Sequence, residues 1–188
     1  MGEKVLPNYS YEAYLALEVE SEVKYEYHDG MIVAMAGGTL EHGVIISNFM
    51  RVLPEMENCT ILPSEVKVHI EASNRTFYPD VSIVCGEFEK SEKDKHAITN
   101  PLLIVEVLSE GTAAFDRGEK FAHYREIPVL KEYVLVSQSA PLVDTYFRTE
   151  NGTWEIETIR SLTESVYLKS IDCEIPMDKI YRKISGIA

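Results

Sequence analysis

The chain has 188 residues, of which 45% are hydrophobic and 26% charged, and this composition suits one globular domain with an ample core. Its 31 acidic and 18 basic residues give a net charge of −13, which argues against broad, non-specific binding to nucleic acid but leaves room for a local basic groove. No apolar run approaches the ~20 residues that span a bilayer, and residues 1–7 show no signal-peptide pattern. We expect a single domain over residues 1–188, a cytoplasmic location and no membrane partner.

The cysteines and histidines show no metal-binding motif. Cys59, Cys85 and Cys173 are odd in number and far apart, without the CxxC spacing of zinc sites. We therefore expect all three to be reduced, buried thiols, as is usual in cytoplasmic proteins. The five histidines are scattered and include no HExxH pair.

The N-terminal part predicts a short helix followed by a β-hairpin. Ser10 is a suitable N-cap for a helix over residues 11–18. The strand patterns of residues 24–28 and 31–36 flank Asp29-Gly30, and a two-residue Asp-Gly loop is a strong hairpin signal.

A second helix is expected from Thr39, its N-cap, to Leu53. Pro54 ends it, because proline lacks the amide N–H and clashes with the preceding turn. Asn48 falls on the face expected to meet solvent. His42 lies in the first turn, where a histidine is usually a surface or capping residue. It is nevertheless close in sequence to residues that could border a functional site. The expected core face consists of Leu40, Val44, Ile45, Phe49, Val52 and Leu53.

Two strand patterns each contain one carboxylate. Residues 66–71 alternate between polar and apolar, and we expect them to pair as a hairpin with a strand over residues 77–85 that contains Asp80. Residues 101–109 form an apolar run that suits a central strand buried on both faces, with Glu106 in the middle. A carboxylate there is costly to bury unless it is paired, protonated or bound to a metal. The alternative is a half-buried strand whose glutamate reaches solvent or an arginine.

A helix is predicted over residues 113–126, followed by a strand over residues 132–137. Asp116, Lys120 and Tyr124 recur at a spacing of four, which places them on one helix face. The strand before this helix and the strand after it form a predicted parallel βαβ unit. The simpler interpretation makes Asp116 and Lys120 only a surface ion pair.

The remaining segments complete the predicted fold. Residues 86–100 are the most polar stretch and read as a solvated loop or short helix. Residues 142–148 and 153–159 form a hairpin pattern, and residues 165–168 and 180–181 suggest a strand and a short terminal helix. This order of elements predicts an α/β or α+β domain with a mixed central sheet flanked by helices and an N-terminal hairpin.

Pro79-Asp80, followed by Glu106, resembles the PD-(D/E)XK nuclease superfamily. More closely, residues 10–137 resemble the Uma-type family of restriction-endonuclease-like proteins. The sequence departs from the superfamily pattern at Leu108, which stands where the Glu-X-Lys triplet has its lysine. The resemblance implies that Lys120, on the following helix, supplies the ammonium group. The segments that carry the resemblance are Tyr25–Gly30, His42, Tyr78–Ser82, Val105–Ser109, Thr112, Asp116, Lys120, Tyr124 and Glu132–Val136.

The resemblance implies an endonuclease that hydrolyses DNA phosphodiester bonds with Mg²⁺ or Mn²⁺. Asp80 and Glu106 would be the metal ligands, since hard carboxylate oxygens suit these ions, and Lys120 would orient the attacking water or stabilise developing negative charge. A homodimer is expected, because two sites cut both strands of a duplex. The further candidates for the site are Glu26, His42, Asp116 and Tyr124.

Some alternatives stay open. Glu26 is either an exposed strand residue or a further ligand or base, and Tyr124 is a candidate to hydrogen-bond a phosphate. The acidic charge favours a non-catalytic dimerisation or binding module that keeps the nuclease fold. A metal-dependent hydrolase of a small phosphorylated ligand is a third candidate, because an acidic surface tolerates such a ligand better than duplex DNA.

Overall fold

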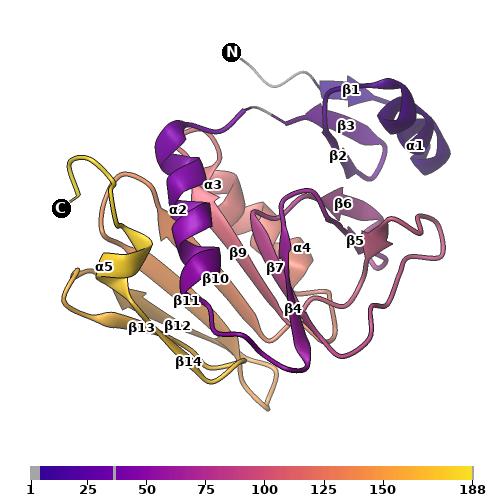
Figure 1. Cartoon of the computed structure of the whole chain (residues 1–188). Helices are drawn as coiled ribbons and strands as arrows, with labels where there is room; N and C mark the ends of the chain where they lie inside the picture. Colours follow the sequence, from indigo (N-terminus) through magenta and orange to yellow (C-terminus); the bar gives the residue numbers. More distant parts are fainter. Residues whose placement is uncertain (1–4, 36, 188) are drawn as a thin grey trace.

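The computed structural model describes residues 5–35 and 37–187, and it is an α+β fold built on two six-stranded sheets (Figure 1). The main sheet is mixed, as predicted, because β9 and β10 are parallel while the other pairs are antiparallel. In order across the sheet, its strands are β12 (Trp154–Ile159), β11 (Val143–Arg148), β10 (Glu132–Ser137), β9 (Leu103–Leu108), β7 (Val81–Cys85) and β4 (Cys59–Pro63).

The second sheet contains the predicted N-terminal hairpin. One of its faces packs on helix α1 (Tyr11–Glu20), which Ser10 caps as predicted by accepting a hydrogen bond from the N–H of Ala13. The expected strand 31–36 ends at Ala34, and its residue 36 lies outside the described residues. In order, the strands are β1 (Val5–Pro7), β3 (Met31–Ala34), β2 (Tyr25–His28), β6 (Arg75–Phe77), β5 (Lys67–Ile70) and β8 (Ala97–Ile98).

Strand β9 is buried on both faces, as its apolar sequence predicted. Side chains alternate across a strand, so neighbouring residues join different cores. Val105 belongs to an apolar cluster with Phe49 of helix α2 (Leu40–Val52), whereas Leu108 belongs to one with Tyr124 of helix α4 (Phe121–Tyr124). Figure 1 shows these two helices on opposite sides of the main sheet. Glu106 shares the α4 face with Leu108.

The strand predicted over residues 77–85 is wrong as a single element. It divides into β6, which ends at Phe77 and pairs with β5 as expected, and β7, which begins at Val81 in the other sheet. Pro79 lies at the break, and a proline cannot donate a hydrogen bond to a central ladder. The break places Asp80 where the two sheets meet.

Helix α2 begins as predicted, with the Thr39 side chain accepting a hydrogen bond from the N–H of His42. Its faces differ from the prediction at two positions. Leu40 is 79% exposed, whereas Asn48 is buried and donates to the carbonyl oxygens of Ile180 and Arg182. The C-terminal helix α5 (Met177–Ile180) packs against α2 and turns that polar position into an internal one.

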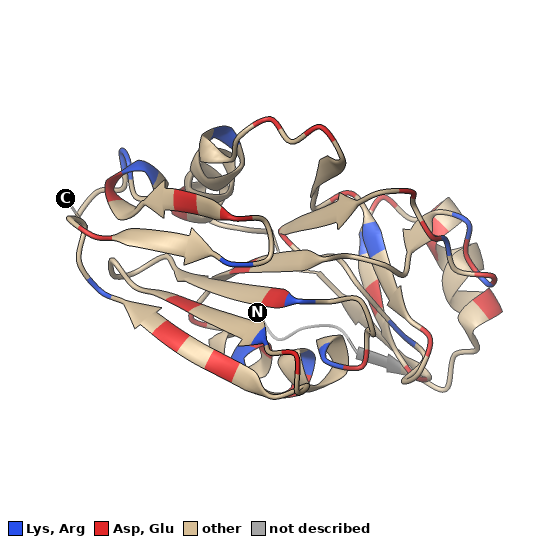
Figure 2. Cartoon of the chain, turned by 90° about the horizontal axis from the view of Figure 1, so that it is seen from below, with Lys and Arg blue, Asp and Glu red and all other residues tan. Residues whose placement is uncertain are grey.

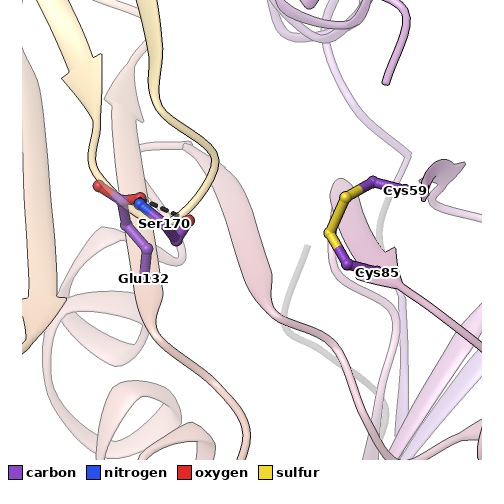
Figure 3. The surroundings of a disulfide bond; sticks show 4 residues. All are labelled: Cys59, Cys85, Glu132 and Ser170. Atoms are coloured by element: carbon purple, nitrogen blue, oxygen red, sulfur yellow. Dashed lines mark hydrogen bonds between the residues drawn. A yellow bond between two sulfur atoms is a disulfide. The ribbon is translucent and has the colours of Figure 1, made fainter. Parts of the chain in front are cut away.

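The expectation of three reduced cysteines is wrong for two of them. Cys59 of β4 and Cys85 of β7 are opposite one another in the sheet register and form a disulfide (Figure 3). Both are half-buried, and Cys173 is the free, buried thiol.

Figure 3 also shows the buried Glu132 accepting hydrogen bonds from Ser170, which ties β10 to the turn after β13 (Ser165–Leu168).

The helix predicted over residues 113–126 is shorter and not uniform. It consists of α3 (Ala113–Phe115), a π-helical segment (Asp116–Lys120) and α4.

Two other segments also differ from the prediction. Residues 86–100, expected as a solvated loop or short helix, contribute the short strand β8, and the C-terminal part contains an unexpected strand, β14 (Cys173–Pro176). No helix within residues 5–35 and 37–187 has the length and apolar character required to cross a membrane.

We predict that Asn48→Ala lowers the free energy of unfolding by about 1–3 kcal/mol, because it leaves two carbonyl oxygens without their donor. Denaturant unfolding measures this difference. The matched control is Asn151→Ala at an exposed hairpin tip, which should change stability by no more than about 0.5 kcal/mol. Equal effects at the two positions would show that Asn48 does not anchor the C-terminal helix.

Candidate active site

The break between the two sheets places Asp80 beside the middle of β9. Val81, the next residue, pairs with β9 in the main sheet. Asp80 Oδ2 accepts a hydrogen bond of 2.7 Å from the N–H of Val107, the residue that follows Glu106, and Asp80 Oδ1 accepts one of 3.0 Å from His42 Nε2. The two carboxylates expected from the sequence therefore lie on adjoining segments, and His42 belongs to the same group of residues.

Lys120 reaches these carboxylates from the following helix. Its Nζ lies 2.7 Å from Glu106 Oε1, 3.6 Å from Glu26 Oε1 and 3.7 Å from Asp116 Oδ1, and its side chain is only 7% exposed. The interpretation of Asp116 and Lys120 as a mere surface pair is therefore wrong. Leu108 stands at the strand position where the superfamily has its lysine, and the ammonium group beside Glu106 comes from the next helix.

Glu26 points into this group of charges instead of toward solvent. On β2 it alternates with buried tyrosines that pack against α1, so its own face turns to the other side. Glu26 Oε1 accepts a hydrogen bond of 3.3 Å from the N–H of Tyr78, and Oε2 accepts one of 3.3 Å from His28 Nε2. The imidazole of His28 in turn stacks on Phe115, with ring centroids 5.6 Å apart.

Two buried tyrosines donate hydrogen bonds to residues of this charged group. Tyr124 donates a hydrogen bond of 3.0 Å to Glu106 Oε1, and Tyr133 donates one of 3.0 Å to the carbonyl oxygen of Asp116. Tyr124 is fully buried, and its hydroxyl is engaged with Glu106. It therefore fixes this carboxylate in place. The role of Tyr133 was not foreseen, since its β10 strand pattern indicates only a buried position.

Negative charge exceeds positive charge in this buried group. Burial raises the pKa of Glu106 to about 8, and the nearby Asp80 and Asp116 carboxylates add to the rise, although Lys120 opposes it. Burial also raises the pKa of Asp116. One lysine cannot compensate all of these carboxylates, so the group favours either a proton on Glu106 or a bound cation.

Neighbouring groups shift the pKa values of Glu26, Lys120 and His42 in the direction that favours their charged forms. Burial alone would raise the pKa of Glu26, but Lys120 and the hydrogen bond from His28 outweigh it and lower that pKa. Burial alone would lower the pKa of Lys120, but its carboxylate neighbours raise it well above the ordinary value. The hydrogen bond to Asp80 raises the pKa of His42.

The charged group lines a cavity of about 370 Å³, a size typical of sites for small ligands. A larger cavity of about 580 Å³ lies beside α1, with Tyr78 bordering both. The lining of the larger cavity contains four lysines and four carboxylates, so its charges balance, and Lys67 pairs there with Glu18 at 2.6 Å and with Asp94 at 2.5 Å. The excess of negative charge marks the smaller cavity as the candidate active site.

The donor set suits Mg²⁺ or Mn²⁺ bound with the help of a substrate. In the described part of the chain, no three His, Cys, Asp or Glu residues are placed to hold a metal ion among themselves. Mg²⁺ commonly binds one or two carboxylates and completes its shell with water and phosphate oxygens. Asp80 and Glu106 are two such carboxylates, and the excess of negative charge in the group around them favours a divalent cation.

Comparison with solved structures finds a protein that shares this fold. A crystal structure described as a "putative nuclease belonging to DUF820" from Anabaena variabilis aligns with 90% of this chain and 96% of its own, with a TM-score of 0.72 and 16% identity. At that identity the likeness establishes the shared fold alone.

The family follows from sequence comparison. The model of the Uma2 family, described as "Putative restriction endonuclease", matches residues 11–177, so the chain belongs to this family and the resemblance seen in its motifs is confirmed. Two Synechocystis proteins are similar along their length: "Uncharacterized protein slr1290", 37% identical over 95% of this chain and 94% of its own, and "Uncharacterized protein sll1609", 36% identical over 75% and 81%.

We predict that Glu106→Gln becomes more stable relative to the parent as pH rises. A carboxyl with a raised folded-state pKa stabilises the fold below its unfolded value of 4.5, and that contribution is lost as pH rises toward about 8. The glutamine variant escapes this loss, so the difference in unfolding free energy should grow by roughly 1–3 kcal/mol between about pH 5 and pH 8.

Denaturant unfolding across this pH range, without divalent ions, measures that difference. Glu119→Gln is the matched control, because Glu119 borders the same cavity but its side chain is 59% exposed. A difference between Glu106→Gln and the parent that stayed constant, or shrank as pH rose, would refute a raised pKa at Glu106.

Proposed function

We propose that the protein is a Mg²⁺- or Mn²⁺-dependent endonuclease that hydrolyses phosphodiester bonds in DNA. The observation that carries this proposal is the contact of 2.7 Å between Lys120 Nζ and Glu106, beside a backbone amide that holds Asp80. Two carboxylates and a lysine are the components of a PD-(D/E)XK site, and here they come from three separate elements. Family membership and the shared nuclease fold support the proposal.

Asp80 and Glu106 are the proposed ligands of the metal ion. When bound, the ion supplies polarisation of a phosphodiester oxygen and a lower pKa for a coordinated water. The N–H of Val107 and the imidazole of His42 each hold one oxygen of Asp80. Tyr124 holds Glu106. These contacts fix both carboxylates before substrate arrives, which avoids reorganisation during the reaction.

Lys120 is proposed as an electrostatic stabiliser of the negative charge that develops on the phosphate. Its raised pKa keeps it protonated, so it cannot accept a proton from water at neutral pH. Glu26 and Asp116, at 3.6 and 3.7 Å, hold the ammonium group between them and thereby position it. On this proposal, these two carboxylates act through Lys120.

The second candidate is a non-catalytic module that binds DNA or a second copy of itself. The net charge of −13 favours it, and in Figure 2 the Lys and Arg residues are dispersed among Asp and Glu. A module that needs only the fold would gain stability by replacing buried, uncompensated carboxylates with apolar residues. The retained cluster therefore favours the enzyme. The homodimer, with one site for each strand of a duplex, remains a prediction.

We predict that Lys120→Ala reduces Mn²⁺-dependent DNA cleavage by about a hundredfold or more, because it removes charge that acts on the transition state. Cleavage of labelled DNA is followed below the melting temperature of every variant. The matched control is Lys131→Ala, an exposed lysine just before β10, which should cut like the parent.

Two results would count against this account in different ways. If Lys120→Ala cuts DNA as fast as the parent, the lysine has no catalytic role. If the parent cuts no DNA, single-stranded or duplex, with either ion, then the binding-module alternative replaces the endonuclease.

A further inference from the structure

We propose that the cavity receives an unpaired nucleotide, so that the substrate is single-stranded DNA or an unpaired end, with a base packed on the side chains of Met31, Val33 and Met35. We call these three residues the apolar wall. This inference rests on the proposed function and names the substrate class of the same site. Nothing in the motifs of the chain assigns a role to the wall.

The apolar wall lies on the same sheet face as the charged group. In the register of β2 and β3, Glu26 is opposite Val33, and His28 is opposite Met31. Ile32, between the two wall residues of β3, turns the other way into the tyrosine cluster beneath α1. All three wall residues border the cavity that contains Glu106 and Lys120. Two wall residues therefore lie on β3, directly beside β2, and the Glu26 carboxylate of β2 lies 3.6 Å from the ammonium group of Lys120.

The charge of the cavity disfavours a duplex. Its described lining contains five carboxylates but no arginine and only one lysine, Lys120, which is already paired with three of them. Proteins that hold duplex DNA neutralise several phosphates with Lys and Arg, and this lining has no further cation to do so. Packing on a base adds a favourable contribution that does not depend on such charges, because every base presents a face on which side chains can pack.

The dimensions of the cavity lead to the same conclusion. Its volume of about 370 Å³ is in the range of small-ligand sites, and Glu106, which borders it, is only 4% exposed. A single strand, or a nucleotide taken out of the stack, enters a site of this size more readily than a bulky duplex. Met31, at 41% exposed, is the most exposed residue of the apolar wall and so the most accessible to a base.

The test compares three oligonucleotides of one sequence: a single strand, a blunt duplex, and a strand whose bases are replaced by abasic sites. Fluorescence anisotropy measures their binding to Glu106→Gln, which holds the substrate without cutting it, and cleavage by the parent is measured with Mn²⁺. We expect the single strand to be bound and cut at least several-fold better than the blunt duplex.

Substitution of the wall gives the second arm. Added to Glu106→Gln, Met31→Ala should weaken binding of the single strand roughly three- to tenfold, the effect of a few buried apolar groups, and should leave binding of the abasic strand unchanged. In the parent it should raise KM and leave kcat unchanged. The control is Ile156→Ala, which removes an apolar side chain that is 62% exposed on the distant edge strand β12 and should have no effect.

The outcomes separate the two proposals. Equal binding of blunt duplex and single strand, or an equal loss on the abasic strand after Met31→Ala, would overturn the nucleotide inference while leaving an endonuclease in place. Binding of the single strand through Met31 without cleavage by the parent would support the nucleotide contact and reject the proposed activity.

Discussion

One buried ammonium group, on Lys120, is shared by the carboxylates of Glu106, Glu26 and Asp116, and this shortage of positive charge governs the cavity. An unpaired buried carboxylate is costly, so it must be protonated, hydrogen-bonded or paired with a cation. Backbone amides, a histidine and a tyrosine meet part of that need. The negative charge that these groups leave uncompensated is the physical basis for proposing a divalent cation.

The fold brings these charges together by interrupting regular structure. Pro79 ends one strand and lets Asp80 lie between two sheets. The π-helical segment, a feature frequent at functional sites, buries Lys120 and Asp116 at its two ends while the three residues between them stay exposed. Glu106 lies within the regular strand β9, on the face that turns toward this helix, and Glu26 lies within the regular strand β2. The site thus depends on elements that meet only in the folded chain.

Local pattern was sufficient for most of the fold and for much of the cluster. The Asp-Gly hairpin, the apolar strand around Glu106 and the spacing of Asp116 and Lys120 each depend on neighbours in sequence, and each was predicted. The features that the sequence did not predict depend on contacts between segments that are distant along the chain. The Cys59–Cys85 disulfide follows from the register of β4 and β7, and the burial of Asn48 follows from the docking of α5. Single-sequence periodicity contains no information about such contacts.

The central claim, that excess buried negative charge forms one cation site, is tested most directly by calorimetric titration of Mn²⁺ into the metal-free protein. The account predicts binding of one ion per chain, weakened at least about tenfold in Glu106→Gln because one carboxylate ligand is lost. Glu119→Gln, at the exposed rim, should bind like the parent. Absence of binding by the parent, or equal affinity of the parent and Glu106→Gln, would contradict the account.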